Sequence, residues 1–175
     1  MEGIKIEDLR TRQEWLFAIE KEEIFLITFL AGEFLADLFI NQSKIRWMRA
    51  TLETGDSFRI SRMKKVLNPI PAEQAPIREY EKPLTERKKR YWRTKIGEQI
   101  IDNPIDHRAS SVLITYAHGQ YGIKIGRSDF SENGELEHFH LYEAPWKEEE
   151  VIEVSVIDPT LEEGNKLSNH PNCPL

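Results

Sequence analysis

One dense apolar stretch, from Ile24 to Ile40, must be removed from water wherever this chain folds. Its first part, residues 24–30, is typical either of a buried strand or of the start of a buried helix, because periodicity cannot separate the two. Its second part places four apolar side chains on one helical face: Phe34, Leu35, Leu38 and Phe39. We therefore expect a helix over most of residues 29–40.

The same stretch is short for a bilayer span, and the carboxylates of Glu33 and Asp37 interrupt it. The first residues lack the basic flank and apolar run of a signal peptide. Cys173 is the only cysteine, which excludes an intramolecular disulfide and a thiolate zinc cage within one chain. We therefore expect a cytoplasmic protein without a membrane span.

Periodicity along the rest of the chain predicts helices first and strands later. Residues 6–23 have the amphipathic spacing of a helix. A second helix is expected over residues 86–101, capped by Thr85. Gly97 weakens this second helix, so a strand through residues 91–93 stays open as the alternative.

Alternating apolar residues predict a basic hairpin of two strands, residues 44–53 and 57–66, joined by Thr54-Gly55-Asp56. Four prolines make residues 68–83 a linker or extended loop. The C-terminal part then predicts an antiparallel sheet with strands near 110–116, 121–127, 135–142 and 150–157. No internal sequence repeat is visible.

These elements add up to the α+β class: N-terminal helices and a basic hairpin, a proline-rich linker, then a helix and a C-terminal antiparallel sheet. A chain of 175 residues fits a single domain. We expect that domain over residues 1–158, followed by a polar, poorly ordered tail over residues 159–175.

Charge is distributed unevenly along the chain. The net charge is −6, but residues 1–40 carry −5, residues 41–108 carry +7 and residues 109–175 carry −8. Such a basic centre indicates either a surface for an anionic partner or a segment that packs against the chain's own acidic ends.

The basic centre also contains aromatic residues, which can stack on nucleic-acid bases while lysine and arginine neutralise phosphates. The same aromatics are equally suited to anchor the segment in a core, with its charges as a solvated face. If the partner is anionic, whether an acidic protein surface or nucleic acid, the expected binding residues are Arg46, Arg49, Arg59, Arg62, Arg87, Lys88, Lys89, Arg90, Trp92 and Arg93.

A second pattern, Glu135-Leu136-Glu137-His138-Phe139-His140, puts two imidazoles on one face of a strand. Two imidazoles bind a divalent metal ion when a third donor comes from elsewhere in the fold. The candidate ligands are His138, His140, His118 and Glu143. The alternative is a polar strand face that binds no metal.

The preferred function is a binding or accessory protein that engages an anionic partner through its basic centre. Two alternatives stay open: a small metal- or acid/base-dependent enzyme with its site on the C-terminal sheet, and a protein with a pocket for a small ligand. The chain has neither a nucleophile elbow nor a phosphate-binding loop. The sequence therefore leaves open whether the protein is an enzyme.

Overall fold

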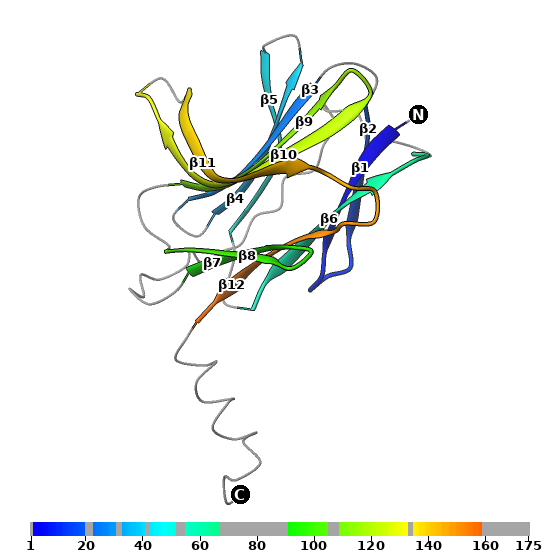
Figure 1. Ribbon diagram of the computed structural model, residues 1–175. Coiled ribbons are helices and arrows are strands. Elements are labelled where there is room, and N and C mark those ends of the chain that lie inside the picture. Colours follow the sequence, from blue (N-terminus) through cyan, green and yellow to red (C-terminus); the bar gives the residue numbers. More distant parts are fainter. Residues whose placement is uncertain are drawn as a thin grey trace, which may run out of the picture.

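All regular secondary structure described in this protein is β-strand, arranged in two antiparallel sheets that pack face to face (Figure 1). The computed structural model describes residues 2–19, 23–30, 33–40, 43–51, 55–66, 91–104, 109–132 and 135–158. Within these ranges no helix is long and apolar enough to cross a membrane.

Each sheet has six strands. Sheet A has the order β2 (Glu14–Ile19), β1 (Glu2–Asp8), β6 (Ser57–Met63), β12 (Ile152–Ile157), β7 (Tyr91–Ile96) and β8 (Gln99–Pro104). Sheet B has the order β11 (Leu136–Pro145), β10 (Gln120–Phe130), β9 (Ala109–Ala117), β3 (Glu23–Leu30), β4 (Glu33–Ile40) and β5 (Ser43–Thr51).

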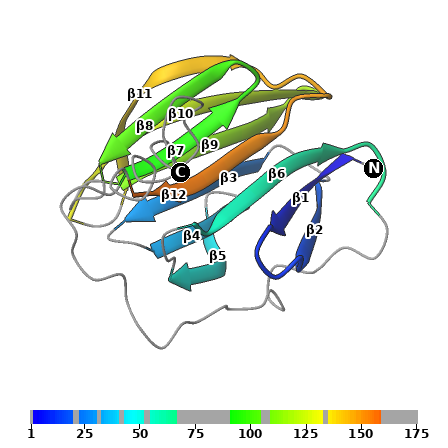
Figure 2. The ribbon, with the colours of Figure 1, turned by 90° about the horizontal axis from the view of Figure 1, so that it is seen from below.

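The connectivity is that of one six-stranded unit used twice, β1–β6 and then β7–β12. In each unit a hairpin lies in sheet A, the next three strands form a meander in sheet B, and the last strand returns to sheet A beside the first. The two units join through β3–β9 and β6–β12, and both of these pairs are antiparallel. The connectivity of the second unit therefore repeats that of the first, although the sequence shows no repeat. Figure 2 shows β6 between β1 and β12, where the two units meet in sheet A.

Large aromatic side chains fill the space between the sheets. The ring of Phe29 in sheet B lies 4.8 Å from that of Trp92 in sheet A, and Phe34 stacks on Phe58 at 4.2 Å. All four side chains are almost completely removed from solvent. Burial of apolar area on this scale is the main favourable term in folding.

The apolar stretch of residues 24–40 forms β3 and β4, the strands at and beside the centre of sheet B. Phe25, Ile27 and Phe29 face sheet A, while Leu26 and Thr28 lie on the other face and are also buried. Strands buried on both faces are apolar at nearly every position, which explains the absence of a clear period.

The α+β prediction is wrong, because its N-terminal helices are strands. Residues 6–23 contain the end of β1, the turn and β2, and Arg12 in the turn has a positive φ of 63°. Trp15, Phe17 and Ile19 alternate into the core with the period of a strand. A helix would have directed Phe17 away from Trp15 and Ile19.

The expected helices over residues 29–40 and 86–101 are also wrong wherever the structure describes them. Residues 33–40 are β4, and residues 91–104 are β7 and β8. Gly97, with a φ of +54°, and Glu98 form the two-residue turn between these strands. The strand alternative through residues 91–93 is confirmed.

The expected hairpin of residues 44–66 has its strands in the right places but in different sheets. β5 pairs with β4 in sheet B, whereas β6 pairs with β1 and β12 in sheet A. The antiparallel meander β9–β10–β11 is confirmed. β12 is a strand as expected, but it belongs to sheet A. The linker, residues 68–83, and the tail, residues 159–175, lie outside the described ranges.

Removal of a core ring should reduce stability strongly. We expect Trp92→Ala to lower the free energy of unfolding by about 3–5 kcal/mol, because the side chain is buried and contacts Phe29 across the sheets. Tyr91→Ala, on the outer face of the same strand, should cost only about 1 kcal/mol. Urea unfolding measures both, and equal midpoint shifts would contradict this assignment of the core.

Candidate functional site

The hairpin β10–β11 forms one edge of sheet B and extends beyond the sandwich. β8, the edge strand of sheet A, contacts β10, and β11 lies one strand further out. Figure 1 shows the free end of the hairpin curving away from sheet A. The outermost strand of sheet B therefore lacks a covering strand from sheet A over its free end.

Gly126 lies where the backbones of β10 and β11 approach closely. It pairs with Leu141, and a Cβ atom at Gly126 would meet the carbonyl oxygen of His140 and lie 2.8 Å from its carbonyl carbon. Only glycine permits the backbones of β10 and β11 to approach so closely. The pairing register also shifts between Asp129 and Phe130, and such irregularities increase the local bend and twist.

Polar residues are exposed on the inner face of the hairpin near its free end. This is the same face of sheet B that covers the core further along β10. On β10, Arg127 and Asp129 continue the alternation that buries Ile123 and Ile125. Across the strand pair Arg127 lies opposite His140, and Asp129 lies opposite His138. We call these four exposed residues the hairpin shelf: Arg127, Asp129, His138 and His140.

The two shelf histidines point the same way, as the sequence predicted. Their ring centroids are 6.3 Å apart. The other two expected metal ligands lie elsewhere: Glu143 is on the opposite face of β11, where it pairs with Lys124 at 3.6 Å, and His118 is in the β9–β10 turn. That turn is roughly 30 Å from His138, the length of β10.

No group of three or more histidine, cysteine, aspartate or glutamate residues arranged to hold a metal ion occurs in the part of the chain that the structure describes. His138 and His140 are thus two potential metal ligands without a third from their own described surroundings. Asp129 and Arg127, one of each charge, are their nearest neighbours across the strand pair.

β11 is the longest of the four edge strands, with 10 residues against 9 in β5 and 6 each in β2 and β8. Among the described residues it pairs on one side only, with β10. Leu141 on its outer face is 68% exposed, more than Ile100 (53%) or Ile24 (41%). An exposed edge of this length is a template for a further strand.

The hydrogen-bonding pattern shows which residues face the free edge. Trp146 donates its backbone N–H to the carbonyl oxygen of Tyr121 at 3.1 Å, one residue beyond the pair of Pro145 and Gly122. In an antiparallel ladder, hydrogen-bonded and non-hydrogen-bonded pairs alternate. The backbone groups directed at the free edge are therefore those of Phe139, Leu141 and Glu143, together with the carbonyl group of Pro145.

The arginines expected to bind an anionic partner are paired within the chain wherever the structure describes them. On β5, the Nε atom of Arg46 lies 2.9 Å from Asp37, and Arg49 forms an ion pair with Glu33. Asp37 is almost completely buried, and the neighbouring guanidinium of Arg46 compensates its charge.

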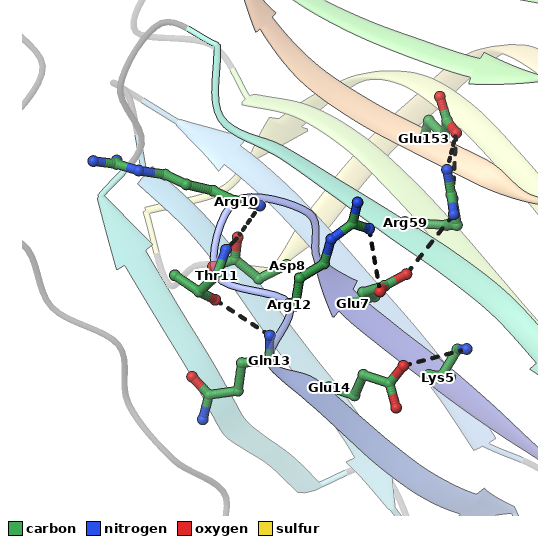
Figure 3. Close-up of polar contacts among 10 residues, drawn as sticks. All are labelled: Lys5, Glu7, Asp8, Arg10, Thr11, Arg12, Gln13, Glu14, Arg59 and Glu153. Carbon is green, nitrogen blue, oxygen red and sulfur yellow. Dashed lines mark hydrogen bonds and ion pairs between the residues drawn. The ribbon is translucent and has the colours of Figure 1, made fainter.

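Two further arginines lie on the outer face of sheet A. Arg59 lies between Glu153 at 3.0 Å and Glu7 at 3.8 Å, as Figure 3 shows. Arg93 forms an ion pair with Asp102 at 3.0 Å on the neighbouring strand. This face is therefore a ladder of alternating charges, with cross-strand pairs that compensate each other.

Arg62 has a structural position on the inner face of β6. It donates a hydrogen bond to the carbonyl oxygen of Trp146 at 2.7 Å, and its guanidinium lies 4.3 Å from the ring centre of Tyr121. It also lies 3.9 Å from Glu2. These contacts join the two sheets.

The remaining expected binding residues divide between the core and the part of the chain that is not described. Trp92 lies in the core, with an exposed fraction of 1%. Residues 87–90, which contain Arg87, Lys88, Lys89 and Arg90, lie outside the described ranges.

Sequence reasoning identified the two shelf histidines but not their neighbours. Arg127 and Asp129 join them only through the register of β10 with β11. The available signal was the alternation of residues 121–129 and of residues 136–145 on either side of Asn133-Gly134, a sequence typical of hairpin turns. The exposed edge had no sequence signal, because strand order is not local information.

No known protein family, curated protein sequence or solved structure matches this chain.

Substitution of Gly126 should loosen the pairing of β10 with β11. We expect Gly126→Ala to lower the free energy of unfolding by about 1–3 kcal/mol, because the new methyl group meets the backbone of β11. It should also speed amide hydrogen exchange in β11. The matched control is Gly122→Ala, where a Cβ atom meets only the hydroxyl oxygen of Thr115 at 2.9 Å. Equal effects of the two changes in urea unfolding and exchange would contradict the role of Gly126.

Proposed function

We propose that this protein is a non-catalytic binding module that holds an extended segment of a partner protein by strand addition at β11. The exposed edge of β11 supports the proposal most directly, since its outward backbone groups have no strand beside them among the described residues. An added strand satisfies such groups, and its alternate side chains contact the two faces of the edge strand. Leu141 provides an apolar contact on the outer face.

The other three edges are less suited to this role. β2 and β8 are short, with six residues each. β5 is nearly as long as β11 but carries three cations, Lys44, Arg46 and Arg49. Its bulge lies in the middle of the strand, whereas the register shift of β11 lies near the free end of the hairpin, at Asp129/Phe130. Charged side chains and bulges are the devices that protect edge strands from pairing.

Binding is better supported than catalysis at the hairpin shelf. Asp129, His138 and His140 include acid/base groups, but all three are exposed on an open strand pair. Catalytic groups act most effectively in sites that exclude water and fix their orientation. The shelf has the exposure of a recognition surface.

An anionic partner remains a second proposal, now centred on residues 87–90. Residues 41–108 carry a net charge of +7, while the described arginines of that segment have acidic partners within the chain. We expect simultaneous alanine substitution of Arg87, Lys88, Lys89 and Arg90 to reduce salt-dependent retention on heparin. Retention equal to that of the unsubstituted protein would remove this proposal.

A proline on the free edge should block strand addition. Leu141 directs its N–H away from β10, so Leu141→Pro removes one outward donor and keeps the ladder with β10. We expect decapeptides selected from a random displayed library on the unsubstituted protein to bind Leu141→Pro at least about tenfold more weakly, the loss of roughly one well-formed hydrogen bond.

The matched control is Leu141→Thr, which retains the N–H and should bind the same peptides with a smaller loss. Backbone amide shifts on peptide addition should be largest at Phe139, Leu141 and Glu143. A library that yields no binder, or peptides that bind the proline variant equally well, would overturn the proposed function.

A further inference from the structure

The pair His138–His140 offers two imidazole ligands, and the described part of one copy adds no third ligand to them. Both imidazoles are exposed on one face of an edge strand, and the fold separates them from Glu143 and His118. Structural zinc sites take four protein ligands. A chain that pairs with the free edge of β11 would bring further donors to this face of the strand.

A second copy can supply these donors through the same edge. If two β11 strands pair antiparallel about a two-fold axis at Phe139, His138 of one copy lies opposite His140 of the other, and the reverse. The two-fold axis is perpendicular to the joined sheet, so the same face of β11 lies on the same side in both copies. All four imidazoles are therefore on one face. Phe139 lies opposite Phe139 of the other copy, on the other face of the sheet.

This register also brings the histidines as close as an antiparallel sheet allows. Phe139 directs its backbone groups outward, so it forms a hydrogen-bonded pair with Phe139 of the other copy. His138 and His140 then occupy the non-hydrogen-bonded pairs, where Cα atoms are about 4.5 Å apart and side chains are closest.

The spacing within one chain matches shared coordination. The ring centroids of His138 and His140 are 6.3 Å apart. With zinc–nitrogen bonds of about 2.0–2.1 Å, two imidazoles on one zinc ion have centroids roughly 5–6 Å apart. Small side-chain rotations therefore bring both rings onto one ion at the centre of the four.

Charge makes this association depend on the metal. Each copy carries a net charge of −6, so like charge opposes the association of two copies without a bound cation. Asp129 lies opposite His138 on β10 and is placed to orient its imidazole, while Arg127 lies opposite His140 and opposes a bound cation.

The histidine pair belongs to this edge alone. β5 occupies the position of β11 in the first six-stranded unit, and its nine residues include no histidine. The pair is therefore no consequence of the repeated topology.

We propose that two copies of this chain pair through β11 and that His138 and His140 of both copies together bind one divalent transition-metal ion of the zinc type. The inference rests on the proposed strand addition at β11. It names the partner, a second copy, and the condition for its binding, a metal ion.

The test adds ZnCl₂ to the full, untagged chain and measures molar mass by light scattering after gel filtration. The expected result is a doubling of mass at one zinc per two chains, reversed by EDTA. His138→Ala and His140→Ala should each abolish the doubling, whereas His118→Asn, which suits the positive φ of 52° at that position, should leave it intact.

Two further variants report on the mechanism. Leu141→Pro should prevent the doubling because it blocks strand pairing, and Asp129→Asn should weaken zinc binding about tenfold or more in competition with a chelating dye. Arg127→Gln should strengthen binding, since it removes the nearest cation.

Several results would overturn the inference. They are a monomeric mass at saturating zinc, assemblies larger than a dimer, and doubling that survives either histidine substitution. If zinc fails to dimerise the chain while selected peptides still distinguish the unsubstituted protein from Leu141→Pro, only this inference fails. If the peptides fail as well, the proposed function fails with it.

Discussion

Face-to-face packing of the two sheets is the interaction on which the rest of this structure depends. Phe29 against Trp92 connects the two six-stranded units across the sandwich, and Phe34 against Phe58 connects the two sheets within the first unit. The units meet again within each sheet, through β3–β9 and β6–β12. Buried residues of both units therefore form one core.

The limits of that core define the candidate site. Sheet A ends at β8, which contacts β10, so the next strand of sheet B continues beyond the covered area. Gly126 permits β10 and β11 to approach closely there, and the inner-face alternation that buries Ile125 exposes Arg127 two residues further along. The same geometry leaves β11 with an open edge, where strand pairing with another chain is possible.

Part of the site was predictable from the sequence, because it depends on local geometry. Alternation along a strand places His138 and His140 on one face whatever the rest of the fold does. The same rule separates Glu143 from them, since it lies an odd number of residues from His140. The pairing of Asp129 with His138 follows from register, and the exposure of the edge follows from sheet order, so neither could be predicted in this way.

The sequence alone determined the charge distribution, the need to bury residues 24–40, and the strands of the C-terminal meander, whose short turns make their pairing local. It did not determine whether residues 6–23 and 29–40 were helix or strand, because short apolar runs satisfy both periods. Only the tertiary structure decided that β5 and β6 lie in different sheets, that the topology repeats, and that the basic residues Arg46, Arg59 and Arg93 have acidic neighbours. These features depend on pairings between segments far apart in the chain, and such pairings are selected by the burial of a common core.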